Sequence, residues 1–193
     1  MDIALSLIIG IGLSAACGFR IFVPFLVMGI AHQAGQLPLA AGFEWIGSIP
    51  AIIAFGTATV LEIAAYYTPW VDNLLDTITT PSAAIAGTVI VASQLGEASP
   101  LVQWSAAVIA GGGISLTVQS GTVATRAVST GTTGGIGNFV VSTIEWMMAL
   151  FLGILAIIVP LLCLLLVSVV LWKMIALMVR SPWFKKHPAD IAA

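Results

Sequence analysis

The chain has 193 residues, of which 60% are hydrophobic and 7% are charged, and its formal net charge is −2. Soluble domains carry about 25% charged residues, so six Lys or Arg and eight Asp or Glu cannot cover a water-facing surface of this size. The hydrophobic residues come in long blocks without a period of two or 3.6, which indicates helices surrounded by lipid. The absence of a basic stripe argues against a nucleic-acid partner. We therefore predict an all-α polytopic transmembrane helical bundle.

The first hydrophobic segment, residues 3–31, is longer than one straight span requires. As a helix it would measure roughly 43 Å, whereas the hydrocarbon core of a bilayer is about 30 Å thick. We predict that this segment is tilted, kinked at Pro24, or broken near residues 17–20 into two half-helices. A faint lipoprotein-like pattern ends at Cys17, but the hydrophobic run continues past it, so the segment is expected to be retained.

The second predicted span covers residues 48–67. Ser48 suits its N-cap, and Pro50 suits its first turn. Glu62 lies inside this span, about one turn before its end. An aromatic belt at the membrane interface is expected next, formed by Tyr66, Tyr67 and Trp70.

Residues 71–80 space their hydrophobic side chains as a helix does, with Asp72 and Asp76 on another face. This pattern favours a short amphipathic helix at the membrane surface or a re-entrant element. Two further segments follow at residues 82–94, which is short for a span, and 100–117. Both contain small residues four positions apart, at Ala83 and Gly87 and at Ala107 and Gly111. Such pairs let helices approach closely in lipid.

Residues 119–138 are rich in Ser, Thr and Gly and contain Arg126. One interpretation is a discontinuous element, whose carbonyls and hydroxyls coordinate an ion or whose amides bind an anion. The other is a flexible loop between spans. Irregular backbone survives at membrane depth only where protein or a water-filled cavity pairs its polar groups.

The last hydrophobic block, residues 139–178, is about two spans long, and Pro160 is its only helix breaker. A hairpin there would leave backbone groups unpaired in lipid, so we favour one long kinked helix over two spans. The total is five or six spans in a single domain, residues 1–181. A basic tail, residues 182–193, places the C-terminus in the cytoplasm by the positive-inside rule, and we expect the bacterial inner membrane.

Charged residues inside the predicted spans are the most informative feature, because each costs about 2.5–3.5 kcal/mol at the bilayer centre. They are Arg20, Glu62, Asp72, Asp76, Arg126 and Glu145. In a structural interpretation they form ion pairs, Arg20 with Glu62 or with one of the two aspartates, and Arg126 with Glu145. In a functional interpretation they line a path for an ion, a proton or a small polar solute, because the four acids outnumber the two arginines.

Other chemistry has little support in the sequence. The two cysteines have neither metal-ligand spacing nor a disulfide framework. No Ser-His-Asp or Cys-His set presents itself, so we do not expect an enzyme. The Gly-rich segment lacks the Gly-Lys-Ser/Thr ending of a phosphate-binding loop, so no nucleotide is expected. We predict no cofactor, and the sequence leaves the question of a metal open.

Motif-like stretches occur at residues 12–24, which read GLSAACGFRIFVP, at residues 61–81, and at residues 121–145. In these stretches the chain resembles the bacterial integral membrane "domain of unknown function" family numbered 4126. It departs from many members at residues 132–135, where a Ser-Pro-Glu-Pro-like turn is replaced, and at Trp146, where an acid is common. The resemblance confers no activity. It implies that a set of polar residues are motif positions, namely Arg20, Glu62, Asp72, Asp76, Arg126, Asn138 and Glu145.

From these observations we predict a channel or transporter for an ion or small polar solute. The alternative is a structural or accessory protein that packs with partner proteins or lipid, with the buried charges as structural ion pairs. The expected partners are the lipid bilayer and the solute itself. The small-residue faces would also allow a homo-oligomer.

Overall fold

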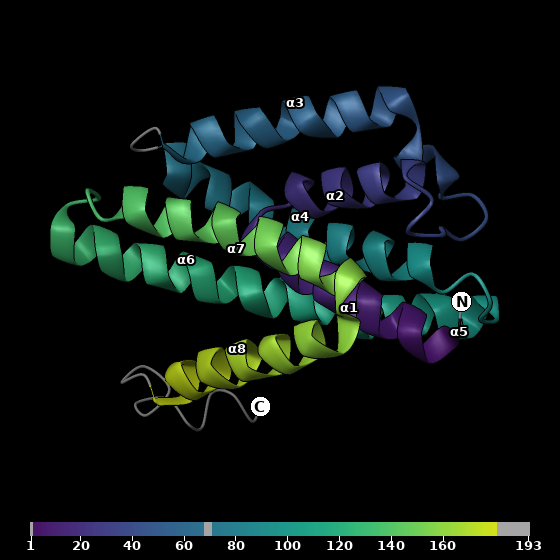
Figure 1. The fold of residues 1–193 in the computed structure, drawn as a ribbon. Helices are drawn as coiled ribbons and strands as arrows, with labels where there is room; N and C mark the ends of the chain where they lie inside the picture. Colours follow the sequence, from purple (N-terminus) through teal and green to yellow (C-terminus); the bar gives the residue numbers. More distant parts are fainter. Residues whose placement is uncertain (1, 68–70, 181–193) are drawn as a thin grey trace.

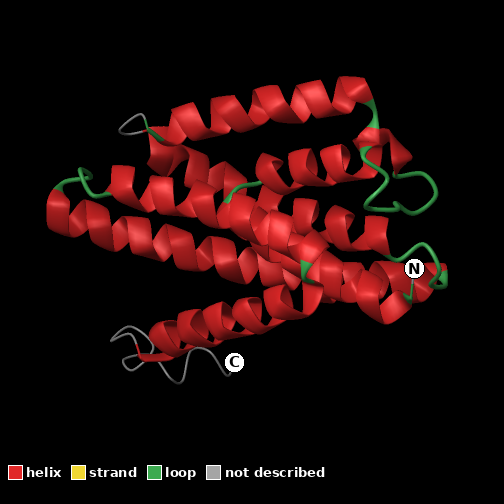
Figure 2. Cartoon of the chain, viewed as in Figure 1, coloured by secondary structure: helices red, strands yellow, loops and turns green. Residues whose placement is uncertain are grey.

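The computed structural model describes residues 2–67 and 71–180, and it describes side chains in these ranges except those of residues 72–74 and 177–180. All regular elements in these ranges are helices joined by short loops (Figure 2). In chain order they are α1 (Ile3–Phe19), α2 (Phe22–Gln33), η1 (Glu44–Gly47), α3 (Ile49–Tyr66), α4 (Val71–Gln94), α5 (Pro100–Ala106), η2 (Ala107–Gly112), α6 (Gly113–Thr133), α7 (Asn138–Ile158) and α8 (Pro160–Arg180). Trp70, the side chain of Asp72 and the predicted tail at 182–193 lie outside the described residues.

The first hydrophobic segment is broken into two helices, which is one of the three alternatives that the sequence left open. Arg20 has extended backbone angles, φ −149° and ψ 126°, and α2 starts two residues later. In a continuous helix, residue 24 would donate its N–H to the carbonyl of Arg20, and Pro24 has no N–H to donate. Proline is tolerated in the first turn of a helix, where N–H groups have no partner inside the helix. The chain therefore breaks at Arg20 and places Pro24 in the first turn of α2.

The break also reverses the chain. The start of α1, the loop after α2 and the end of α4 line one small cavity, through Ser6, residues 38–40 and Gln94. The Ala40 N–H donates to the Ser93 carbonyl at 2.7 Å, which fixes that loop against the end of α4. The outer ends of α1 and α2 therefore lie at the same end of the bundle, near the N label of Figure 1.

α3 begins as its sequence predicts. The Ser48 hydroxyl accepts a hydrogen bond from the Ala51 N–H at 3.3 Å, and Pro50 lies in the first turn. The predicted aromatic belt is wrong for Tyr66, which is buried, with only 4% of its surface exposed. Its burial follows from the position of α4, which turns back along the bundle and presents Asp76 and Thr79 to it.

α4 is one helix of 24 residues, and the expected boundary between residues 71–80 and 82–94 is absent within it. Pro81 removes one backbone hydrogen bond, but the hydroxyls of Thr80 and Ser82 each bond a carbonyl four residues earlier. The polar face that suggested a surface helix instead packs against α6, where Thr79 accepts from Gln119. Buried polar partners thus replace the water that we expected.

The Ser/Thr/Gly-rich stretch is also helical, so the predicted irregular segment is wrong for most of its length. Helix runs from Pro100 to Thr133, with a π-helical part at η2 in the middle. Its threonine hydroxyls bond carbonyls one turn earlier, as Thr125 does to Gly121 at 2.8 Å. In lipid, a helix pairs every backbone group locally, which outweighs the low helix propensity of Gly, Ser and Thr. Only residues 134–137 form a turn, where Gly134 and Gly135 adopt φ of +64° and +92°.

The last hydrophobic block forms two helices, so the favoured single kinked helix is wrong. α7 ends at Ile158 and α8 begins at Pro160, with only Val159 outside the helices. The Val159 N–H still donates to Leu155, and the Cys163 N–H donates to the Val159 carbonyl. Proline suits the first position of a helix because it has no N–H that would need a partner there. With Pro160 at the start of α8, the reversal leaves fewer backbone N–H groups unpaired than we expected. α8 then folds back below α6 and α7 (Figure 1), with Met174 packed against Gly121.

Close approach of small residues holds the centre of the bundle together. A Cβ atom added at Gly87 of α4 would lie 2.5 Å from the carbonyl oxygen of Gly111 in η2. The Ser14 hydroxyl of α1 donates to the same Gly111 carbonyl. Both predicted small-residue pairs therefore pack within the chain, in the region where α1, α4 and η2 cross.

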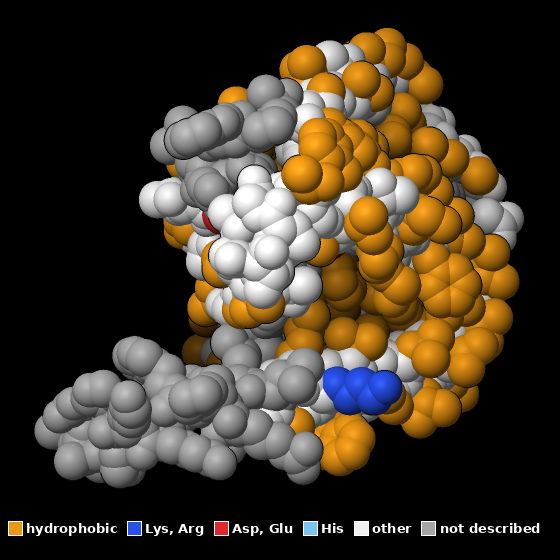
Figure 3. All heavy atoms as spheres, turned by 90° about the vertical axis from the view of Figure 1, so that its left-hand side faces the viewer, with side chains coloured by type: hydrophobic (Ala, Val, Ile, Leu, Met, Phe, Trp, Pro, Cys, Tyr) orange, Lys and Arg blue, Asp and Glu red, His pale blue; other side chains and the backbone are white. Residues whose placement is uncertain are grey.

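The outer surface suits lipid. Figure 3 shows hydrophobic side chains over most of the described surface on one face, with few charged atoms among them. Four helical segments are long and apolar enough to cross a membrane, namely Ile49–Tyr66, Leu75–Gln94, Pro100–Thr133 and Asn138–Ile158. The protein is therefore all-helical and membrane-like over its described residues, and the count of five or six spans stays a prediction.

Candidate functional site

Five charged side chains, four from helices and one from the break between α1 and α2, gather beside that break. Arg20 comes from the break itself, Glu62 from α3, Asp76 from α4, Arg126 from α6 and Glu145 from α7. We call this set the charge cluster. None of the five exposes more than 9% of its surface, and the two arginines expose 1% each. The structure thus brings together five of the seven residues that the sequence singled out.

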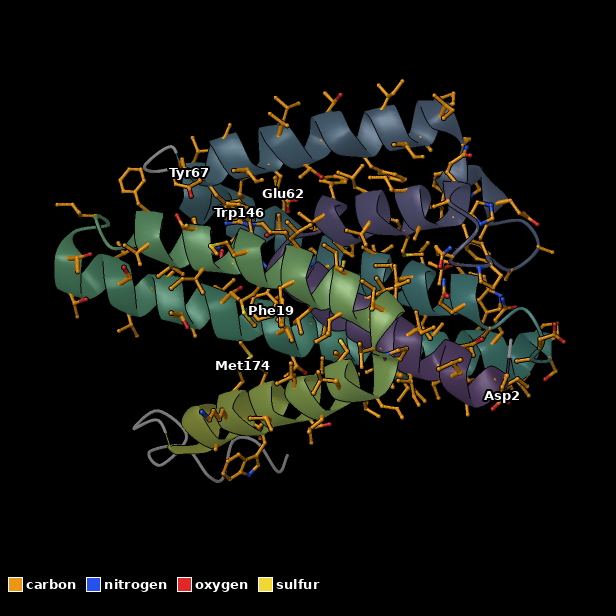
Figure 4. All side chains as sticks on the ribbon, viewed as in Figure 1. Asp2, Phe19, Glu62, Tyr67, Trp146 and Met174 are labelled. Atoms are coloured by element: carbon orange, nitrogen blue, oxygen red, sulfur yellow. The ribbon has the colours of Figure 1, made fainter. Side chains whose placement is uncertain are left out.

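Glu62 holds the start of α2. Its Oε1 accepts the Ile21 N–H at 2.9 Å, and its Oε2 accepts the Phe22 N–H at 3.2 Å. The first N–H groups of a helix have no partner within the helix and form its positive end. In Figure 4, Glu62 points from α3 into the bundle. The expected ion pair of Arg20 with Glu62 is therefore wrong, because Glu62 binds backbone amides instead, whereas the alternative with Asp72 falls on a side chain outside the described residues.

Glu145 bridges the two arginines. Its Oε2 accepts from Arg20 Nη2 at 2.9 Å and from Arg126 Nη1 at 2.5 Å. The Arg20 Nη2 also lies 3.4 Å from the Ser142 carbonyl, one turn before Glu145. The predicted pairing of Arg126 with Glu145 is confirmed, and Arg20 joins the same carboxylate.

Arg126 also forms a two-pronged ion pair with Asp76. Its Nη2 donates to Oδ1 at 2.6 Å, and its Nε donates to Oδ2 at 3.1 Å. Planar guanidinium and carboxylate groups match in this geometry, which is stronger and more directional than a single contact. Arg126 therefore links α4 to α7 through two carboxylates.

Tyr66 is a central residue that the sequence reasoning missed. Its ring contacts both guanidinium groups, whose Cζ atoms are 3.8 Å (Arg20) and 4.6 Å (Arg126) from its centre. Its hydroxyl donates to Asp76 at 3.1 Å and bonds Thr79 at 3.0 Å. A signal was present, since Tyr66 follows Glu62 by four residues and so shares its helix face.

The two remaining sequence candidates are not placed in the cluster. Asn138 lies at the start of α7, two turns before Glu145, and its amide donates to the Thr130 hydroxyl at 2.9 Å. It thereby ties α7 to the end of α6 beside the 134–137 turn. The side chain of Asp72 lies outside the described residues.

Several polar atoms in the cluster have no hydrogen-bond partner among the described residues. They are Nε and Nη1 of Arg20 and Oε1 of Glu145. Buried polar atoms are nearly always paired with protein or water, and an unpaired one costs about 1–3 kcal/mol. The cluster therefore offers both donors and an acceptor to a further polar group.

Metal binding has no such support. Among the side chains that the structure describes, which do not include that of Asp72, no group of three or more His, Cys, Asp or Glu could hold a metal ion. Cys17 and Cys163 are buried free thiols on different helices. His32 bonds the Leu37 carbonyl through Nδ1 at 2.9 Å and so closes the loop after α2.

We expect Tyr66→Phe to lower the free energy of unfolding by about 1.5–3 kcal/mol, because it removes a buried hydrogen bond to a charged group. Tyr66→Leu should cost about 2 kcal/mol more, since it also removes the ring from two desolvated cations. Unfolding of the purified protein in detergent measures both. Tyr67→Phe is the control, because among the described residues its hydroxyl bonds the neutral Thr143 hydroxyl in a half-buried position. Equal losses for the two Tyr66 variants would contradict a stabilising contact of the ring with the two arginines.

The comparisons with known proteins identify a family for this chain. No curated protein and no solved structure matches the chain. The model of the family described as "Domain of unknown function (DUF4126)" matches residues 7–180, which include every charge of the cluster. The chain therefore belongs to this family, as its resemblance implied.

Proposed function

We propose that the protein is a channel or transporter for an ion or small polar solute, and that the charge cluster is its binding site. The observation that carries this proposal is the presence of unpaired donors and an unpaired acceptor inside a buried cluster of five charges. Charges inside a membrane protein are costly and usually mark a solute or proton path. A purely structural cluster would gain stability by pairing these atoms, whereas a binding site must keep some of them available.

The helix break supports the same proposal. The start of α1 and the end of α2 lie at the same end of the bundle. The two helices meet at the break, beside the charge cluster. In many transporters, discontinuous helices expose their ends to a solute near the middle of the membrane. We propose that α1 and α2 form such a re-entrant pair, in the bacterial inner membrane with the C-terminus in the cytoplasm.

Exchange of ion-pair partners supplies a mechanism. Arg126 contacts Asp76 on α4 and Glu145 on α7, so a solute that binds either carboxylate competes directly with it. Release of one contact would loosen α4 from α7 and open the site, and re-formation of the contact would close it. Occupancy of the site would thus be coupled to access.

The experiment is solute flux into liposomes that contain the purified protein, with a panel of monovalent cations, anions and small neutral solutes. Wild type should conduct one class of solute, and Asp76→Asn should reduce that flux at least tenfold while the protein still folds. Glu97→Gln, a change of an exposed loop carboxylate, is the matched control and should keep full flux. Absence of flux for every solute from folded wild type would contradict the proposal and favour an accessory role.

A further inference from the structure

We propose that the carboxylate of Glu62 occupies an anion-binding site at the start of α2 as a tethered ligand, and that a small monovalent anion can take its place. This inference rests on the proposed function, because it names the class of solute that the charge cluster would bind. It starts from the contacts of Glu62 and Arg20.

The Glu62 carboxylate is held as a bound anion would be. Each of its oxygens accepts one backbone N–H, from Ile21 and from Phe22, at the positive end of a helix of 12 residues. Such helix starts bind carboxylates, phosphates and sulfates in many proteins. The capping side chain usually comes from the residue just before the helix, but Ile21 cannot supply one, and Glu62 reaches the amides from α3, some 40 residues later in the chain.

Charge balance identifies Glu62 as the replaceable group. Arg20 and Arg126 contribute +2 to the cluster, and Asp76 and Glu145, which pair with them directly, contribute −2. Glu62 adds one further negative charge, so that the five described groups sum to −1. A monovalent anion in place of the Glu62 carboxylate would leave this sum unchanged, and a cation would not bind between backbone N–H groups.

Arg20 provides the second, independent sign of a ligand. Its side chain is 1% exposed, and it precedes the helix start that Glu62 caps, close enough for the two charges to interact. Its Nε and Nη1 have no hydrogen-bond partner among the described residues. A guanidinium with unpaired N–H groups beside the amides of a helix start makes a strong anion receptor once those amides are released. With Glu62 withdrawn, the site would offer an anion both kinds of donor.

The position of α3 allows Glu62 to withdraw. Figure 1 shows α3 at the outer edge of the bundle, where it lies along α2. Most of its surface is exposed on the lipid-facing side, and its buried residues are Thr59, Glu62 and Tyr66. Rotation of the Glu62 side chain alone would remove the carboxylate from the amides, while Tyr66 on the same helix keeps its hydrogen bonds to Asp76 and Thr79 of α4.

The test is rescue of Glu62→Ala by added anions. We expect this variant to unfold at a lower temperature than wild type in detergent with a bulky, weakly binding anion. Its midpoint should rise with the logarithm of the formate or chloride concentration, because these anions bind only the folded state. At matched ionic strength, Glu44→Ala is the control, since Glu44 also accepts a backbone N–H, that of Gly42 at 2.7 Å, but at the exposed start of η1.

The outcomes are distinct. A midpoint of Glu62→Ala that responds to formate and chloride no more than that of Glu44→Ala overturns the inference and makes Glu62 an ordinary helix cap. If Glu62→Ala yields no folded protein in any anion, Glu62→Gln decides, because it keeps one oxygen acceptor and loses the charge. A formate-dependent midpoint of Glu62→Gln supports the site, and an anion-independent one overturns it.

The same variants separate this inference from the proposed function. Flux of a cation through wild type, with no anion response in Glu62→Ala, would preserve the transport proposal and overturn the anion site. Anion rescue without flux of any solute would preserve the anion site and overturn transport. Anion rescue together with formate or chloride flux would support both.

Discussion

Replacing Glu145 with alanine is expected to lower the free energy of unfolding by about 3–5 kcal/mol, because removal of one partner leaves buried charges uncompensated. The Oε2 atom of Glu145 accepts from both arginines, and all three side chains are at least 97% buried. Arg126 would keep its contacts with Asp76, but Arg20 would lose the one ion pair that it forms with a described residue. Arg20 therefore accounts for most of the expected loss.

A double-mutant cycle measures this directly. Arg20→Met removes the cation, and methionine can fill part of the same volume beside Tyr66. We expect Arg20→Met combined with Glu145→Ala to be more stable than Glu145→Ala alone, with a coupling energy of about 1–3 kcal/mol. Unfolding in detergent gives all four values, and Glu97→Ala in an exposed loop gives the background. Additive losses would contradict direct pairing of Arg20 with Glu145.

Local physics made much of the fold predictable. Long hydrophobic blocks with few charges specify helices in lipid, and Ser48 and Pro50 set the start of α3 where the helix begins. The first segment was too long for one span, so a break was required, and Gly18 and Pro24 limited its position to the residues around Arg20. These predictions depend on residues that are close to one another in the sequence, so the sequence alone is enough to make them.

The errors occurred where partners distant in the sequence decide the outcome. Residues 71–80 and 119–133 are polar enough to suggest water or irregular backbone, but each supplies the polar partners of the other through Thr79 and Gln119 and through Asp76 and Arg126. Neither segment reveals this by itself. The turn at Val159 depends similarly on α1, because Gly12 leaves room for Ala156 and Cys163 at the reversal.

In the candidate site, too, the features that depend on single residues were predictable, and the contacts between distant residues were not. Intramembrane position identified the charged residues, because a charge in lipid is costly wherever it lies. The pairing was only half predictable, since Arg126 meets Glu145 as expected, whereas Glu62 binds the amides of α2 and not Arg20. Backbone amides become available only because the chain breaks at Arg20, and a break predicted to within a few residues does not specify which amides are free.

Arg126 is the residue whose replacement should separate stability from function most clearly. Three of its nitrogen atoms are used, with Nε and Nη2 on Asp76 and Nη1 on Glu145. Lysine keeps the charge but has a single ammonium group, which cannot hold both carboxylates in this planar geometry. We expect Arg126→Lys to cost about 1–3 kcal/mol and Arg126→Met about 3–5 kcal/mol, because only the latter leaves two buried carboxylates without their shared cation.

Flux through liposomes that contain these variants tests whether exchange of this pair opens the site. If Arg126 couples α4 to α7, Arg126→Lys should remain folded but lose at least nine-tenths of the solute flux, since one ammonium cannot hold both helices and release them in turn. Lys173→Met on the exposed face of α8 is the control and should change neither quantity. Full flux in Arg126→Lys would show that positive charge alone suffices at this position, and it would exclude the two-pronged contact with Asp76 as the part that moves.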